Sequence, residues 1–218
     1  MSQALAARLA ELLGPDVGVG KSACSGTEGL FPEERPAILR AVPKRRAEFA
    51  AGRRAARAAL AEIGEPAVAL PVGNHRAPIW PPGICGSISH DQGVAFAAVT
   101  RIGSLGIDLT EAAPLPGETR RAILPHASET GLDPLSERVG FSAKESLFKA
   151  IFPFVGRYFG FSAARVAPDL SSGTFRIELT ETLGPFAAGT SWGGGLAVIE
   201  PNLVTALRVS ADVNAAPL

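Results

Sequence analysis

Two carboxylates and two lysines carry the residue types and spacing that suggest chemistry. Asp108 lies in the apolar segment LGIDLTE, and Glu145 lies in FSAKESLFKAIFP between Lys144 and Lys149. A carboxylate within an apolar strand is costly unless it is paired or bound to a cation. If Asp108 and Glu145 meet in space, they offer the few carboxylates that Mg²⁺ prefers, and the lysines can neutralise phosphate charge.

The same residues also fit structural roles. Asp108 suits a strand whose polar face meets water. Ser142 and Glu145 have the spacing of a helix capping box, and Glu145 with Lys149 forms an i to i+4 pair worth about 0.3 kcal/mol. Spacing alone therefore leaves open whether these groups come together.

A further candidate is the segment GSISHD, which contains Ser89 and His90 and follows the proline- and glycine-rich stretch PVGNHRAPIWPPGIC. A lone histidine near a strand end is commonly a hydrogen-bonded structural residue, because its role depends on its neighbours. Ser89 is also compatible with the start of a turn.

The clearest predicted helix runs between Pro43 and Gly64, which are typical start and stop residues. Helical geometry brings Arg46, Arg53 and Arg57 within about 40° of one another on one face. Arginine binds phosphate oxygens with two parallel hydrogen bonds, so this stripe suits a nucleotide phosphate. A solvated helix surface explains the same pattern, and a nucleic-acid surface is less favoured because aromatic residues are not interleaved.

The elements expected to position these residues indicate an α+β fold in two similar lobes, residues 1–105 and 106–218, each with helices packed on a mainly antiparallel sheet. Apolar spacing predicts the following elements: helices at 2–13, 43–64, around 116–129 and at 141–153, strands at 17–23, 174–181, 193–200 and 203–209, and a hairpin over 93–110 that turns at 101–104. Residues 211–218 are expected to fray.

Composition limits the possible partners. The 218 residues contain 21 basic and 21 acidic side chains, which provides no argument for a nucleic-acid or membrane partner. No apolar run reaches the roughly 18 residues of a membrane span. Cys24 and Cys85 match no zinc spacing and suit a reduced, cytoplasmic protein.

Several motifs in order resemble one family. KRRAEFAAGRRAAR, RAPIWPPGICGSISHD, LGIDLT and FSAKESLFKAIFP, between about residues 40 and 153, are similar to the 4′-phosphopantetheinyl transferases of the enterobactin synthetase component D and surfactin-synthetase-activating type. The resemblance implies a monomeric, pseudo-dimeric α+β fold with coenzyme A and Mg²⁺ between the lobes. It also implies transfer of 4′-phosphopantetheine to a serine of an acyl or peptidyl carrier protein, with release of adenosine 3′,5′-bisphosphate, in siderophore, nonribosomal peptide or polyketide synthesis.

The resemblance assigns the coenzyme contacts by position. Arg46, Arg53 and Arg57 would hold the 3′-phosphate and adenine side of coenzyme A, and Arg76 would add a phosphate contact. Ser89 and His90 resemble a phosphate-binding pair in which His90 donates hydrogen bonds.

The resemblance also assigns the reacting end. Asp108 and Glu145 resemble Mg²⁺ ligands, Lys144 a pyrophosphate contact, and Lys149 a residue that stabilises charge on the reacting phosphate. Glu145 is also a candidate to accept the serine proton, directly or through water. Glu145, Lys149 and His90 are therefore the catalytic candidates.

One position departs from the family pattern, which reads Asp-x-Glu at the metal strand. Here Thr110 stands where the second acid is expected, and Glu111 follows one residue late. Successive strand residues point to opposite faces, so Glu111 should point away from Asp108 unless the strand ends or bulges. Thr110 is able to hold a metal-bound water, and we expect weakened or altered Mg²⁺ binding.

Two other functions remain open at this point. One is a non-catalytic coenzyme A or nucleotide-binding module, and the other is a metal-dependent phosphohydrolase that activates water. Residues 111–140, with Leu115, Ile123, Leu124 and Leu132, form either a carrier-docking surface or a plain connector between lobes.

Overall fold

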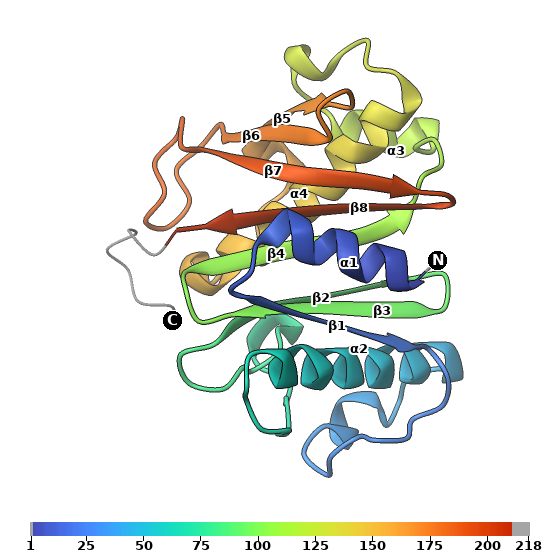
Figure 1. Cartoon of the computed structure of the whole chain (residues 1–218). Coiled ribbons are helices and arrows are strands. Elements are labelled where there is room, and N and C mark those ends of the chain that lie inside the picture. The colour runs from blue at the N-terminus through green and yellow to red at the C-terminus, as the bar shows by residue number, and fades with distance from the viewer. Residues whose placement is uncertain (1, 211–218) are drawn as a thin grey trace.

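The computed structural model describes residues 2–210, which form two antiparallel sheets with helices packed on them (Figure 1). The first half of the chain contains these elements: α1 (Ser2–Leu13), β1 (Val17–Ala23), α2 (Pro43–Glu62), β2 (Cys85–Asp91) and β3 (Val94–Thr100). The second half contains these: β4 (Ser104–Glu111), α3 (Gly117–Ile123), α4 (Pro134–Val155), β5 (Ala164–Asp169), β6 (Thr174–Leu179), β7 (Ser191–Ile199) and β8 (Asn202–Val209). Short 3₁₀ turns occupy four connections: η1 (Arg35–Ile38), η2 (Asn74–Arg76), η3 (Ala127–Glu129) and η4 (Phe161–Ala163).

The first sheet has three strands in the order β1-β3-β2, with β3 in the centre. Alternate residues of β3 face opposite sides: Ala95, Ala97 and Val99 belong to the core beneath α2, whereas Phe96 and Ala98 belong to the core beneath α1. The small side chains allow α2 to lie close to the sheet. A two-residue turn at Gln92–Gly93, both with positive φ, joins β2 to β3.

The second sheet has five strands in the order β4-β8-β7-β6-β5, and α4 packs against β4 and β8. Gly106 of β4 is required for this packing, since a Cβ there would overlap the carbonyl oxygen of Ser146. The close approach brings the side chains of one face of α4 to the face of β4 that carries Asp108. This face becomes the floor of the candidate site.

Helix α1 contacts β1 of the first sheet and β7 and β8 of the second, and Figure 1 shows it lying across both sheets. Its Leu5 and Leu9 are fully buried in a core that also contains Leu105 and Ile107 of β4. Apolar residues of β4 therefore point toward α1, while Asp108 points the other way, toward α4.

Strands β2 and β4 are the adjacent edges of the two sheets, and serine hydroxyls join them. Ser87 Oγ accepts a hydrogen bond from the Ile107 N–H (3.1 Å), and Ser89 Oγ accepts one from the Leu109 N–H (3.0 Å). The contacts advance in the same direction along both strands, so β2 and β4 run parallel. Ser89 of β2 thus lies directly beside Asp108 of β4.

The predicted α+β class is confirmed, as are the helices beginning at residues 2 and 43, the strand at 17–23 and the three C-terminal strands. The predicted hairpin over 93–110 is wrong, because β3 pairs with β1 and β2 whereas β4 pairs with β8. An apolar alternation identifies a strand but does not specify its partner. β5 was not predicted, and the expected fraying at 211–218 lies outside the described residues.

The capping box expected at Ser142 is also wrong. Helix α4 begins earlier, at Pro134, where the side chain of Asp133 accepts hydrogen bonds from the N–H groups of Leu135 and Ser136. Ser142 lies in the helix interior and points toward β4. An Asp-Pro start is an equally strong helix signal.

The segment after β4 is mostly exposed between residues 111 and 135, but three of its apolar side chains are internal. Leu115, Ile123 and Leu124 are buried in the core of the five-stranded sheet, so the expectation that these three side chains contribute to a carrier-docking surface is wrong. A docking role for the rest of residues 111–140 stays a prediction. Between residues 2 and 210, no helix combines the length and apolar character needed to cross a membrane.

Candidate active site

An open pocket of about 380 Å³ lies where β2, β4 and α4 meet. Three elements far apart in the sequence line it: Ile88, Ser89, His90 and Asp91 from β2, Asp108, Leu109 and Thr110 from β4, and Phe141, Glu145 and Lys149 from α4. The i, i+4, i+8 spacing on α4 places its three residues on one helix face. Asp108 and Glu145 therefore share one pocket.

The carboxylate of Asp108 is held from three sides. Its Oδ1 accepts hydrogen bonds from Lys149 Nζ (2.7 Å) and Ser89 Oγ (3.0 Å), and its Oδ2 accepts one from Ser142 Oγ (2.9 Å). Asp108 is only 7% exposed. A cation and hydroxyl donors placed in this way offset the cost of burying a carboxylate.

Lys149 makes a full set of hydrogen bonds at the same point. Its ammonium donates to Asp108 Oδ1, to the Ile107 carbonyl oxygen (3.0 Å) and to Ser89 Oγ (3.2 Å). An ammonium has three N–H donors, and each has an acceptor here. The i to i+4 ion pair expected between Glu145 and Lys149 is not formed, because Lys149 reaches β4 instead.

Glu145 is the opposite case. Its half-buried carboxylate has no hydrogen bond or salt bridge to any residue between 2 and 210, although it lines the pocket. Burial raises the pKa of Glu145, the charge of nearby Lys149 lowers it, and the charge of Asp108 raises it further. Such a carboxylate is stabilised by a proton or by an incoming cation.

His90 is held by α2 at the rim of the pocket. Its Nε2 lies 2.8 Å from an Nη of Arg45, and its Nδ1 lies 3.9 Å from Glu48 Oε2. Because a guanidinium only donates, Nε2 must accept and the proton belongs on Nδ1. Burial lowers the pKa of His90, so the ring is neutral near pH 7.

Strand β4 continues without a bulge through Glu111, which pairs in register with Asn202. Thr110 therefore shares the face of Asp108 and lines the pocket, while Glu111 is exposed on the other face. Within the described chain, no three or more His, Cys, Asp or Glu residues group as a metal site. Asp108, Glu145 and the Thr110 hydroxyl form a donor set that fits Mg²⁺ provided that water and phosphate complete its shell.

The arginine stripe of α2 is largely engaged within the N-terminal half. Arg53 is buried, donates to the Leu70 carbonyl oxygen (2.7 Å) and stacks on Phe49, and burial lowers its pKa to about 10. Arg57 pairs with the fully buried Glu34 (2.7 Å).

Two further arginines of the predicted coenzyme site are exposed. Arg46 donates to the carbonyl oxygens of Leu39 and Ala41, and Arg76 lies in η2 with a positive φ of 67°. Neither these two nor Arg53 and Arg57 line the pocket of Asp108. Their contacts with coenzyme A remain predictions.

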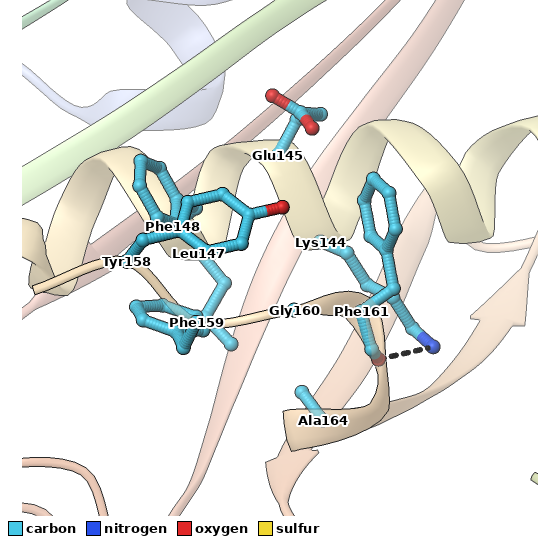
Figure 2. Close-up of a pocket in the computed structure, with 9 residues that line it drawn as sticks. All are labelled: Lys144, Glu145, Leu147, Phe148, Tyr158, Phe159, Gly160, Phe161 and Ala164. Carbon is cyan, nitrogen blue, oxygen red and sulfur yellow. Dashed lines mark hydrogen bonds between the residues drawn. The ribbon is translucent and has the colours of Figure 1, made fainter. Parts of the chain in front are cut away.

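Lys144 lies on the other side of α4 from the pocket of Asp108. Its buried ammonium pairs with Glu129 (2.7 Å) and donates to the carbonyl oxygens of Ile123 and Phe161. Figure 2 shows this amine beside Phe161, with Glu145 extending away on a different side of the helix. Lys144 and Glu145 also border a smaller cavity of about 100 Å³ that is lined by Phe148, Tyr158, Phe159 and Phe161.

Sequence reasoning missed two groups at the site. Ser142 contacts Asp108, but it was interpreted as a helix cap because the true start of α4 was overlooked. Arg45 contacts His90 but lies off the face that carries Arg46, Arg53 and Arg57. The Asp133-Pro134 pair is the sequence signal that places Ser142 inside the helix. No sequence signal indicates that Arg45 contacts His90 on a distant strand.

Comparison with known proteins assigns the family. The model of the 4′-phosphopantetheinyl transferase N-terminal domain matches residues 33–100. The chain is 42% identical over 201 residues to the 4′-phosphopantetheinyl transferase Svp of Streptomyces mobaraensis. The aligned region covers 86% of this chain and 81% of Svp. It is 40% identical over 163 residues to the 4′-phosphopantetheinyl transferase Npt of Nocardia iowensis, an alignment that covers 68% of this chain and 73% of Npt. It is also 40% identical over 116 residues to enterobactin synthase component D of Salmonella typhi, covering 49% of this chain and 48% of that protein.

The chain belongs to the 4′-phosphopantetheinyl transferase family. The resemblance found in the sequence motifs is therefore confirmed, and with it the prediction that the protein is an enzyme of this transferase class.

Proposed function

We propose that the pocket between β2, β4 and α4 is where this enzyme moves 4′-phosphopantetheine from coenzyme A to a serine of an acyl or peptidyl carrier protein, releasing adenosine 3′,5′-bisphosphate. The observation that carries the proposal is the meeting of Asp108 and Glu145 in one pocket with Lys149 and His90 at its walls. Phosphoryl transfer depends mainly on position and charge, and this pocket supplies both signs of charge.

Asp108 and Glu145 are the residues that would hold Mg²⁺, with Thr110 able to hold a water of its shell. Bound Mg²⁺ would neutralise charge on the diphosphate. The unpaired carboxylate of Glu145, whose pKa burial raises, supports this assignment because it lines the pocket without a salt bridge to any residue between 2 and 210.

In the reaction, a bond forms between the serine oxygen and the β-phosphorus, and the bond from that phosphorus to the oxygen bridging the two phosphates breaks. Glu145 accepts the serine proton, directly or through water, and the bridging oxygen leaves with the adenosine 3′,5′-bisphosphate. Ser89, His90 and Lys149 contact phosphate oxygens at the pocket wall. No enzyme nucleophile is required.

Arg46 and Arg76 are the exposed members of the predicted coenzyme set, and their exposure supports contact with the 3′-phosphate. Arg53 and Arg57 would contribute through the positive potential of α2, because their guanidinium groups already have internal partners. Lys144 would likewise act from behind α4, where Glu129 holds it.

We further infer that residues 1–105 and 106–218 are the two similar lobes of a pseudo-dimeric, monomeric enzyme. A long helix over an antiparallel sheet in each half supports this division. The free Cys24 and Cys85 support a cytoplasmic location. The similarity to enterobactin synthase component D supports carriers of siderophore synthesis, and nonribosomal peptide or polyketide carriers are the other candidates.

Mass spectrometry of an apo carrier protein tests the proposal. After incubation with enzyme, coenzyme A and Mg²⁺, the carrier should gain the mass of 4′-phosphopantetheine, and Glu145→Gln should prevent the gain. Glu62→Gln is the matched control, because Glu62 is an exposed glutamate of helix α2. Coenzyme A binding without transfer would instead indicate a binding module, and cleavage of coenzyme A without carrier modification would indicate a hydrolase.

A further inference from the structure

Asp108 and Glu145 share a pocket but differ in how their charge is compensated. Asp108 Oδ1 faces the Lys149 ammonium at 2.7 Å, whereas Glu145 has no ion pair with any residue from 2 to 210. The Lys149 side chain is 24% exposed and the Asp108 side chain 9% exposed, so water screens their attraction only in part. One pocket acid is thus already neutralised by the chain itself.

The contacts of Asp108 leave little room for another cation. A carboxylate offers about four lone-pair positions. Lys149, Ser89 and Ser142 occupy three of them, and two of these three contacts are on Oδ1. A divalent ion close to Oδ1 would be repelled by the ammonium that already lies there. Such an ion can bind Oδ1 of Asp108 only if the Lys149 ammonium moves away from it.

Lys149 has the same constraint from its own side. All three of its N–H donors are used, on Asp108, Ser89 and the Ile107 carbonyl oxygen. Contact with a phosphate requires it to release at least one of these acceptors. Its flexible four-carbon stem, which starts on α4, allows the ammonium to move within the pocket it lines.

We propose that Lys149 is a built-in counter-ion of Asp108 which a divalent cation replaces, so that cation binding transfers the Lys149 ammonium from Asp108 to a substrate diphosphate. The diphosphate half of this statement rests on the proposed function. Lys149 then acts first as a positioning residue, because its hydrogen bond to Oδ1 orients the Asp108 carboxylate, and second as a phosphate contact. Cation and diphosphate binding become coupled through one side chain.

Binding of Mn²⁺ alone, measured by titration calorimetry without coenzyme A or carrier, tests the exchange. Lys149→Gln should bind Mn²⁺ about five- to tenfold more tightly than the wild type, because a competing charge is removed. Lys149→Arg keeps the charge and should bind as weakly as the wild type, as should Lys44→Gln, an exposed lysine of α2. Asp108→Asn should abolish the gain when combined with Lys149→Gln.

The proposal would be overturned if Lys149→Gln bound Mn²⁺ as weakly as the wild type or more weakly. It would also be overturned if neither the wild type nor Lys149→Gln bound Mn²⁺. If Lys149→Gln does not fold, NMR of the ¹⁵N-labelled lysine ammonium groups in the wild type provides the second measurement, with Lys149 assigned from the spectrum of Lys149→Arg. Mg²⁺ should shift the Lys149 signal and accelerate its proton exchange. An unchanged signal at saturating Mg²⁺ would contradict the exchange.

These measurements separate the inference from the proposed function. Carrier modification without tighter Mn²⁺ binding by Lys149→Gln rejects the inference alone. Tighter binding in a protein that never modifies a carrier rejects the transferase proposal and keeps the exchange at Asp108.

Discussion

Helices α2 and α4 have similar lengths, begin with proline and each pack on an antiparallel sheet, yet they use their charged side chains in different ways. Arg53 and Arg57 of α2 turn toward loops of their own half, where Leu70 and Glu34 accept their hydrogen bonds. Glu145 and Lys149 of α4 turn toward the junction between the two sheets. The direction of a helix face, rather than its charge, decides whether it forms a site.

Two glutamates show the same contrast. Glu34 is fully buried, and its oxygens accept hydrogen bonds from Arg57, the Leu70 N–H and the Phe31 N–H. Glu145 is half buried and has no such donors among the described residues. We therefore expect Glu34 to serve stability and Glu145 to serve activity, and this difference can be tested directly.

The largest effect is expected for Glu145→Gln, which should lower the rate of carrier modification by about 100-fold or more, since it removes a proton acceptor and cation ligand. The free energy of unfolding should stay the same or rise slightly, because a desolvated charge without partners is lost. Carrier mass spectrometry and thermal unfolding measure the two quantities. If Glu145→Gln unfolded more easily than the wild type, Glu145 would contribute to stability as Glu34 does, and the expected difference between the two glutamates would be lost.

Glu34→Gln is expected to have the opposite effects to Glu145→Gln on stability and on transfer. It leaves Arg57 without its buried anion, so the free energy of unfolding should fall by about 3 kcal/mol, while the transfer rate per folded molecule changes little. Urea denaturation monitored by circular dichroism provides the measurement. Full stability combined with lost transfer would show that the N-terminal half is not primarily a structural anchor.

Thr110 and Glu111 sharpen the comparison within the C-terminal half. Thr110→Val removes the hydroxyl that faces the pocket and should weaken Mg²⁺ binding about fivefold, the effect of one lost hydrogen bond. Glu111→Gln is the matched control and should have no effect, because Glu111 lies on the opposite strand face. Calorimetric titration with Mg²⁺ compares the two. If Glu111→Gln weakened Mg²⁺ binding more than Thr110→Val did, a bulge in β4 would have to turn Glu111 toward the pocket.

The smallest effect concerns His90, where α2 meets the pocket. Burial lowers the pKa of His90 below 6.5, so the folded protein binds fewer protons than the unfolded chain at mildly acidic pH. Its contribution to stability is present above pH 6.5 and is lost as the pH falls through the folded pKa. The free energy of unfolding of His90→Gln, followed as a function of pH, should lack this acid-side loss. Identical pH profiles for mutant and wild type would contradict the burial of a neutral ring.

Part of the fold and site could be predicted from local pattern. Helix α2 was delimited by Pro43 and Gly64, and strand β6 by its alternating apolar residues. Strand alternation also placed Thr110, rather than Glu111, on the face of Asp108. The pairing of β3 and β4 was mispredicted, because a strand pattern does not specify its partner.

The sequence by itself determined which residues have the chemistry: an acid in an apolar strand, an acid and lysines on one helix, and a His-Ser pair. It also determined the family, because motif order is a property of the chain. Only the tertiary structure decided that Lys149 neutralises Asp108, that Lys144 turns away to Glu129, and that Arg53 and Arg57 are internal. The physical reason is that the partner of a charged group depends on which distant element packs against it, and local spacing does not encode that packing.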